Sequence, residues 1–313
     1  MRKMKIYILP VFMLFIVAEV EAQSRILPVS ELPTSSQSLS LGNVRMGNMN
    51  SALIYNNPTA IFDSTPINDD YSLGFIPSGD DTYLFHTLTA GYKRGKSGFV
   101  VGGRYLSMGS FDNWLNTDMA DEPLGKIRFY SYTLDLGYAY KLNESFSFYS
   151  TMGYVEEKTT SAVRAYRLDV GSYYKANSLL FDKEIDYSIG LEVGNIEKYT
   201  YSGNSDFLAP NARLGASAMT ETVANQSIGV FVEGGVFLPV ANNEFASSFA
   251  AGIDYSFFKK YSISLGGHTG EQDDFLSAGF GVKYSLFDFS FGTKIALLND
   301  LNDMYMLGLK IGI

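Results

Sequence analysis

The segment from Leu276 to Ile313 alternates between two kinds of side chain. One set is bulky and apolar, as at Phe289 and Phe291, and the other is small or singly charged, as at Ser290 and Gly292. Side chains two residues apart share one face of a β-strand, so this period of two gives each strand an apolar face and a polar face. A soluble sandwich would bury the apolar face. Small polar residues opposite bulky aromatic ones instead suit a barrel with lipid outside and a polar lumen.

The composition agrees with a chain built from strands. The 313 residues include 22 Tyr, 23 Phe and 30 Gly, and aromatic residues are enriched in strands. The hydrophobic fraction is an ordinary 46%, as expected where lipid-facing and lumen-facing residues average out. Beyond the N-terminal leader no run of 18 apolar residues occurs, so we expect no transmembrane helix there. The length is sufficient to close a large barrel.

Fourteen segments after residue 70 have the length and alternation of strands. Most have 11 to 16 residues, slightly more than the ~9–11 that cross the hydrocarbon layer. Their expected ranges are 71–78, 82–94, 97–109, 127–142, 144–157, 160–175, 184–196, 209–220, 225–239, 244–258, 260–270, 273–285, 286–297 and 302–313. The sequence therefore predicts an all-β fold, a transmembrane antiparallel barrel of about 14 strands over residues 71–313.

The connections between these segments support the barrel. Counted from the periplasm, the odd connections face outward, and the two longest, 110–126 and 198–208, are both odd. Most even connections are short, with 175–183 as an exception. Long outer loops and tight inner turns are typical of outer-membrane barrels. Twelve or sixteen strands would keep the same parity and remain alternatives.

Charged residues within the strands fall on the polar face of the alternation. On the lipid face each would cost ~2–4 kcal/mol near the midplane, so their position is strong physical support for a polar lumen. The residues expected to face the lumen include Arg104, Asp135, Arg167, Asp169, Glu192, Arg213, Glu233 and Asp254. Their mixed sign predicts a salt-bridged, partly filled interior.

The first 22 residues have the features of a secretory signal peptide. Arg2, Lys3 and Lys5 form a basic start, an apolar stretch follows, and Ala22 suits the last position before cleavage. A short membrane anchor is the alternative, but the apolar core is short for a span. A signal peptide predicts export of the chain.

Residues 23–70 differ from the rest of the chain. They hold four of the nine prolines and lack long alternation, so they do not resemble barrel wall. They nevertheless carry apolar residues that need burial, such as Leu39, Val44 and Ile54. We expect these residues to form a hatch segment that folds into the lumen.

Two short stretches resemble the PorV/PorQ family of outer-membrane proteins, within the wider FadL-like barrels. Leu41-Gly42 and Asn57-Pro58 match the family's Leu-Gly and Asn-Pro pattern, although Gln37 and Ser38 stand near its usual Arg and Thr59 replaces its usual Ala. Residues 103–109, Gly-Arg-Tyr-Leu-Ser-Met-Gly, are similar to a second family segment. The resemblance implies a fourteen-stranded barrel with an N-terminal hatch, located in the outer membrane. Leu41, Gly42, Asn57 and Pro58 are then candidate hatch residues. A plain structural turn inside the lumen is the favoured interpretation of Asn57 and Pro58, and a hatch-locking element is the alternative.

The sequence offers little support for catalytic or metal chemistry. The two histidines, His86 and His268, have no ligand spacing, and the chain contains no cysteine. We therefore expect no catalytic, metal or cofactor site. The net charge of −9 argues against nucleic-acid binding. Trp114, the single tryptophan, lies in an expected outer loop and is a candidate for contact with a partner, the headgroups or the barrel mouth.

Two functions remain as hypotheses. The family resemblance implies a non-enzymatic component of type IX secretion or of cargo attachment at the surface, with machinery or cargo proteins as partners besides membrane lipid. The alternative is a FadL-like passive transporter of a small hydrophobic ligand, which needs an apolar pocket between hatch and wall. A lumen rich in Gly, Ser and charge favours the first hypothesis.

Overall fold

The structure is a computed structural model. It describes residues 28–47, 52–63, 67–78, 81–112, 125–180, 183–201, 204–207, 209–223, 225–238, 246–270, 273–297 and 302–312. The expected leader, residues 1–22, and Trp114 lie outside the described residues. The predictions for them therefore stay predictions.

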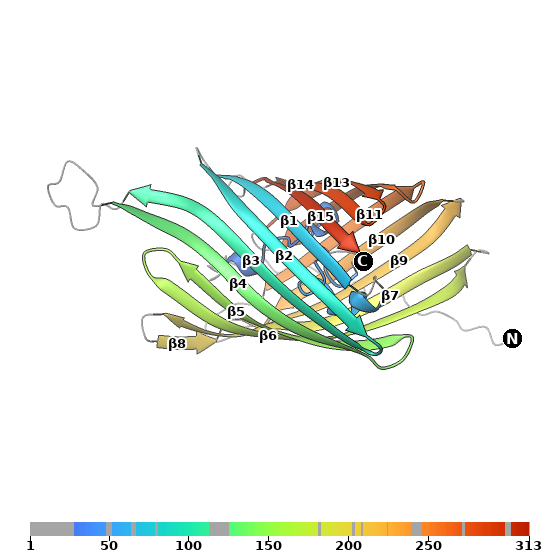
Figure 1. Cartoon of the computed structure of the whole chain (residues 1–313), viewed down its shortest axis with the longest axis horizontal. Helices are drawn as coiled ribbons and strands as arrows, with labels where there is room; N and C mark the ends of the chain where they lie inside the picture. The colour runs from blue at the N-terminus through green and yellow to red at the C-terminus, as the bar shows by residue number, and fades with distance from the viewer. Residues whose placement is uncertain are drawn as a thin grey trace.

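One antiparallel sheet closes on itself to form the barrel (Figure 1). Its strands are β1 Ile67–Ser78, β2 Asp81–Arg94, β3 Ser97–Asp112, β4 Lys126–Lys141, β5 Phe146–Lys158, β6 Ala162–Leu180, β7 Lys183–Tyr201, β8 Asn204–Phe207, β9 Asn211–Val223, β10 Gln226–Phe237, β11 Ala246–Phe257, β12 Tyr261–Gly270, β13 Phe275–Tyr284, β14 Phe287–Ala296 and β15 Met304–Gly312. Neighbours in sequence pair, except that β8 and β9 both pair with β7, and β1 pairs with β15 so that Leu73 lies opposite Leu307. This last pairing closes the wall.

The short strand β8 is an extension of β9. It pairs with β7 as far as Phe207 opposite Lys198, and β9 takes over the same neighbour from Asn211 opposite Gly194. The interruption lies beside Asn195, whose φ of 53° marks an irregularity in β7. The fifteen described strands therefore form a fourteen-stranded wall, and the predicted fold is confirmed.

The largest differences from the predicted strand boundaries lie at the start of β1 and in two expected loops. β1 begins at Ile67 rather than at residue 71, because Asn68 and Asp70 face the polar lumen, where residues that strands usually avoid are accommodated. The expected loop 175–183 is mostly strand, since β6 runs to Leu180 and β7 starts at Lys183. The expected loop 198–208 is largely the β7–β8 hairpin.

The two faces of the wall follow the alternation. In β2, Phe85 and Thr87 are buried toward the interior, whereas Leu84 and Leu88 are exposed on the outside. In the last hairpin Phe289 is exposed, whereas Ser290 contacts the interior. The outer surface is thus apolar, as contact with lipid requires.

The hairpins at the two ends of the barrel differ in how far they project. The hairpins β3–β4, β5–β6 and β7–β8 reach furthest to the left in Figure 1. The opposite end carries short turns, such as that between β13 and β14. Because outer-membrane barrels place long loops outside and short turns in the periplasm, the raised end is the extracellular end. It is formed by β3 to β8.

The N-terminal residues 28–47 and 52–63, called the lumenal segment below, lie inside the barrel (Figure 1). They contain η2 Pro28–Ser30, α1 Ser36–Ser40 and η3 Pro58–Phe62. A capping box of Ser35 and Ser38 starts α1. In the described part of the chain, no helix has the length and apolar character needed to span a membrane.

Candidate functional site

The interface between the lumenal segment and the wall is the candidate functional site. Its periplasmic side rests on an apolar cluster around η3. Ile54 and Ile61 are buried and pack with Val100, Ala139 and Tyr149 of β3, β4 and β5. At ~25 cal/mol per Å2 of apolar area, burial of two such side chains stabilises the docked segment by several kcal/mol.

A second apolar cluster lies nearer the extracellular end. Val29 and Leu39 of the lumenal segment are fully buried there and pack among Phe85, Leu106 and Met304. Because Val29 lies near the start of the described chain, the segment spans the lumen from the extracellular half to the periplasmic turn of η3. It therefore contacts the wall at several levels.

Between these clusters the backbone of the segment lies directly against wall glycines. A Cβ on Gly266 would lie 2.3 Å from the amide nitrogen of Gly42, and one on Gly292 would lie 2.2 Å from the carbonyl oxygen of Ser36. Both distances are shorter than real contacts, so the wall must lack side chains at these positions. Gly42 itself has a φ of 75°, which favours glycine where α1 ends. Leu41 beside it is buried against β11.

Glu233 of β10 anchors the middle of the segment. One of its carboxylate oxygens accepts hydrogen bonds from the backbone N–H groups of Arg45 and Met46, at 2.8 Å and 2.7 Å. Burial, together with the nearby charge of Arg213, lowers the pKa of Arg45 to about 10, so the guanidinium remains charged at neutral pH. The carboxylate thus fixes the segment through its backbone rather than through a replaceable side chain.

Arg104 of β3 holds the extracellular part of the segment. Its Nη1 donates to the carbonyl oxygens of Val29 and Ser30, each at 3.1 Å. The same guanidinium lies over the ring of Tyr55, 4.4 Å from the centroid. One wall side chain therefore connects η2 to a residue 25 positions further along the lumenal segment.

Asp135 of β4 joins the segment to the wall charges. It accepts a hydrogen bond from the Tyr55 hydroxyl at 2.8 Å and one from Arg167 at 2.8 Å. Burial and the Asp135 charge raise the pKa of Tyr55, so its hydroxyl remains a donor. Arg167 also lies 3.2 Å from Asp169. The pairs are buried, so removal of one partner is costly.

Glu31 completes the network from the lumenal side. Its carboxylate lies 3.5 Å from Arg213 and accepts a hydrogen bond from Asn195 at 3.0 Å. Arg213 in turn lies 3.4 Å from Glu192, whose other oxygen accepts the Tyr149 hydroxyl at 2.6 Å. Acidic groups of the segment and the wall thus share one wall arginine.

The structure places seven of the eight predicted lumen charges in or beside this network. Asp254 stands apart and accepts hydrogen bonds from Ser256 and Ser264. Asn57 and Pro58 start η3, where the Asn57 side chain accepts the Thr59 N–H at 3.1 Å. The sequence analysis did not identify Glu31, Arg45 and Tyr55 as site residues. Each carries a charge or a phenol hydroxyl within a segment expected to be buried, and this could have indicated a polar partner in the wall.

The two histidines lie apart. His86 faces outward, with its Nδ1 2.9 Å from the Tyr71 hydroxyl. His268 lies near the extracellular end of the lumen, its Nδ1 3.3 Å from the Gly42 carbonyl oxygen. Among the described residues no group of three or more His, Asp or Glu is arranged to hold a metal ion.

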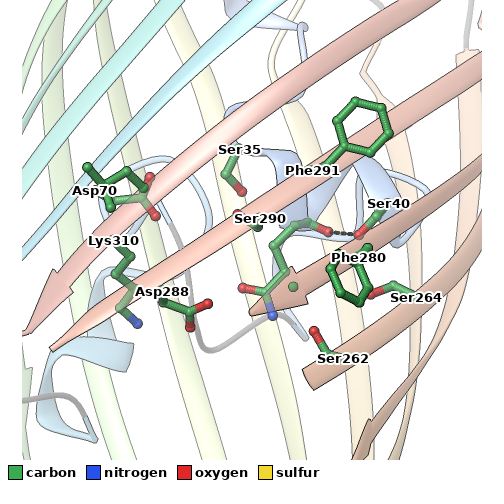
Figure 2. Close-up of a pocket in the computed structure, with 13 residues that line it drawn as sticks. Ser35, Ser40, Asp70, Ser262, Ser264, Phe280, Asp288, Ser290, Phe291 and Lys310 are labelled. Carbon is green, nitrogen blue, oxygen red and sulfur yellow. Dashed lines mark hydrogen bonds between the residues drawn. The ribbon is translucent and has the colours of Figure 1, made fainter. Parts of the chain in front are cut away.

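Two of the cavities beside the described part of the lumenal segment are small and polar. The larger, of about 50 Å3, lies below α1, with Asp70, Asp288 and Lys310 on one side and Ser40 and Ser264 on the other (Figure 2). The second, of about 10 Å3, lies within the charge network. Ligand pockets for small molecules usually measure ~300–1,000 Å3, so these spaces suit water instead.

Two solved structures with the same fold are described as toluene transporters. The toluene transporter TbuX of Ralstonia pickettii has a TM-score of 0.55 at 12% identity, covering 89% of this chain and 98% of that chain. The Pseudomonas putida toluene transporter TodX has a TM-score of 0.55 at 8% identity, with the same coverage. At such identities the likeness shows the fold alone. The chain therefore has the closed β-barrel fold of these two transporters.

A family comparison gives the more particular result. The model of the family described as type IX secretion system protein PorV matches residues 84–238, from β2 to just past β10 and slightly less than half of the chain. The match includes residues 103–109 but not the Leu-Gly and Asn-Pro stretches. No curated protein matches. The chain is an outer-membrane β-barrel that is similar to PorV proteins over residues 84–238, and the resemblance inferred from its sequence is confirmed there.

Proposed function

We propose that this protein is a closed, non-enzymatic component of type IX secretion that acts through contacts with other proteins. The observation that carries the proposal is the lumenal segment, held by Glu233, Arg104 and Asp135 and packed against wall glycines. A segment with anchors on strands around the whole wall serves as a hatch. We expect such a hatch to block a continuous route for a solute.

The partners that we propose are secretion-machinery or cargo proteins. The match to the PorV family supports this assignment, because that family is described by its place in the secretion system. The raised extracellular end formed by β3 to β8 supports it too, since it offers surface beyond the membrane. Residues 113–124 with Trp114 connect two of these strands and belong to the same proposed contact region.

The second candidate function is passive transport of hydrophobic molecules. It is favoured by the fold shared with the two toluene transporters. The cavities argue against it, because those around the segment measure about 50 Å3 and 10 Å3 and are lined largely by polar and charged side chains. A transporter of aromatic molecules needs an apolar space several times larger.

The test is removal of residues 38–63 followed by conductance in planar bilayers. Wild-type protein should conduct poorly, and the deletion variant should conduct much better, because the barrel wall closes through β1 and β15 without these residues. A heat-modifiable gel shift would verify that the deleted barrel is folded. Large, stable conductance of the wild type, unchanged by the deletion, would exclude the hatch and favour an open channel.

Secretion is measured separately. In cells that lack the endogenous protein, the full chain should restore export of a type IX substrate, and uptake of toluene by proteoliposomes should stay at the level of empty vesicles. Restored uptake without restored export would make transport the better assignment.

A further inference from the structure

The outer face of β4 to β7 changes character toward the extracellular end in defined rows. Strand register places Leu136, Met152, Leu168 and Ile196 side by side, and all are apolar. The next row outward contains Leu134, Tyr154, Tyr166 and Lys198. Beyond it lie Tyr132, Glu156 and Arg164, then Tyr130 beside Lys158. Toward the extracellular end, the apolar surface therefore gives way first to tyrosine side chains and then to charged side chains.

The tyrosines form a continuous ladder over β3 to β6. Ring centroids are 6.4 Å apart from Tyr105 to Tyr130, 6.3 Å to Tyr132, 6.0 Å to Tyr154 and 5.5 Å to Tyr166. Tyrosine rings concentrate where the hydrocarbon layer meets the headgroups. The ladder thus places the rows that it crosses, and the row just beyond it, at the level of the headgroups in the extracellular leaflet.

Basic side chains dominate those rows. Arg128, Lys158, Arg164 and Lys198 all face outward and are exposed. The acidic neighbour Glu156 accepts hydrogen bonds from Tyr154 at 2.8 Å and from Arg164 at 2.9 Å. Glu156 therefore neutralises one of the four. Arg128, Lys158 and Lys198 make no ion pair with side chains that the structure describes.

The opposite arc of the barrel lacks this feature. At the extracellular ends of β11, β12, β14 and β15, the outward-facing described side chains include Ser247, Thr269, Ile295 and Tyr305, none of them basic. A general solubility requirement would distribute charge around the rim. Among the described residues, exposed basic side chains beyond the apolar band are therefore concentrated on the raised arc formed by β4 to β7.

We propose that this surface, Arg128, Lys158, Arg164 and Lys198 above the tyrosine ladder, binds phosphate-bearing lipid headgroups of the extracellular leaflet. Guanidinium and ammonium groups pair with phosphate, and clusters of them next to a membrane surface attract anionic lipid. The tyrosine hydroxyls add hydrogen-bond partners for the sugar or glycerol part. Glu156 orients Arg164 and limits the total positive charge. The lipid would fix the barrel's orientation about its axis relative to bound neighbours.

The experiment measures lipid retained by the full chain after purification in detergent, with native mass spectrometry and lipid A carrying both phosphates as the probe. The triple variant Arg128→Gln, Lys158→Gln, Lys198→Gln should reduce retention roughly tenfold or more. The matched control Arg94→Gln, Lys183→Gln, Lys260→Gln removes the same charge from exposed positions at the periplasmic end and should stay within about twofold. A heat-modifiable gel shift verifies folding of each variant.

Two further measurements sharpen the test. Glu156→Gln removes the competing anion and should raise retention by roughly two- to fivefold. Lipid A without phosphates should be retained no better by the wild type than by the triple variant. Equal losses in the triple variant and its control, or full retention of the dephosphorylated probe, would overturn the proposal. So would loss of a co-purifying protein with lipid retention unchanged, because the surface would then be a protein interface.

Discussion

Replacement of Glu233 by alanine should loosen the lumenal segment without damaging the wall. The carboxylate accepts the N–H groups of Arg45 and Met46, and all three lie in the buried interior. Alanine leaves two buried donors without an acceptor, at about 1–3 kcal/mol each. The cost of about 2–6 kcal/mol falls on docking of the segment. A cost in the middle of this range raises the ratio of molecules with a displaced segment to molecules with a docked segment by ~10^3.

The assay is hydrogen–deuterium exchange of the protein in detergent, followed over residues 41–47 and over β10. Amides of the segment should exchange far faster in Glu233→Ala, whereas wall amides should keep their protection. Glu233→Gln retains an acceptor and should cost only about 1–2 kcal/mol. Glu221→Ala, at an exposed ion pair with Lys259, should have no effect. Unchanged exchange in Glu233→Ala would refute the anchoring role.

Three other changes test the site and the register. Gly292→Val should displace Ser36 and raise bilayer conductance, whereas Gly234→Ala, with nothing within 4 Å of the added Cβ, should not. Burial raises the pKa of Tyr55, so the stabilising effect of the Tyr55 hydroxyl is full below the unfolded pKa of about 10 and is lost as pH rises above that value. Hydrogen exchange of the lumenal segment should therefore accelerate above pH ~10 in wild type and depend less on pH in Tyr55→Phe. Phe289→Arg places a charge on the lipid face at ~2–4 kcal/mol and should lower the yield of heat-modifiable barrel, and a normal yield would contradict the register.

The wall was predictable because lipid imposes a simple rule on it. Every second side chain must be apolar, and this regularity indicates strands even at average hydrophobicity. The prediction failed at Asn68 and Asp70, since strand preferences measured in soluble proteins do not apply to a face that lines a polar lumen. Alternation places Ser290 on the polar face but does not show that it has a partner in the lumenal segment. Ser290 lies 2.6 Å from the Ser36 hydroxyl, so substitution there would displace α1.

The interior was less predictable because its contacts join distant positions. Alternation indicates that Asp135 points inward, but not that it meets Tyr55. Strand register fixes neighbours along the wall, whereas contacts across the lumen depend on barrel shape and on the path of an irregular segment. Residues such as Glu31 and Arg45 carry no periodic signal, so only the assembled structure reveals their partners.

The path of the lumenal segment constrains the order in which the chain can assemble. Ser36 contacts Ser290 across 254 positions, and β1 finds its second neighbour only in β15. Contacts across such long sequence separations form slowly. The N-terminal residues can therefore complete their contacts only after the C-terminal strands have formed. η3 packs against β2 to β5 and α1 packs against β12 to β15. The docked segment is therefore enclosed by wall strands from opposite parts of the barrel. We therefore expect the segment to dock before β1 and β15 pair, so that closure of the seam and loss of bulk water from the interior coincide.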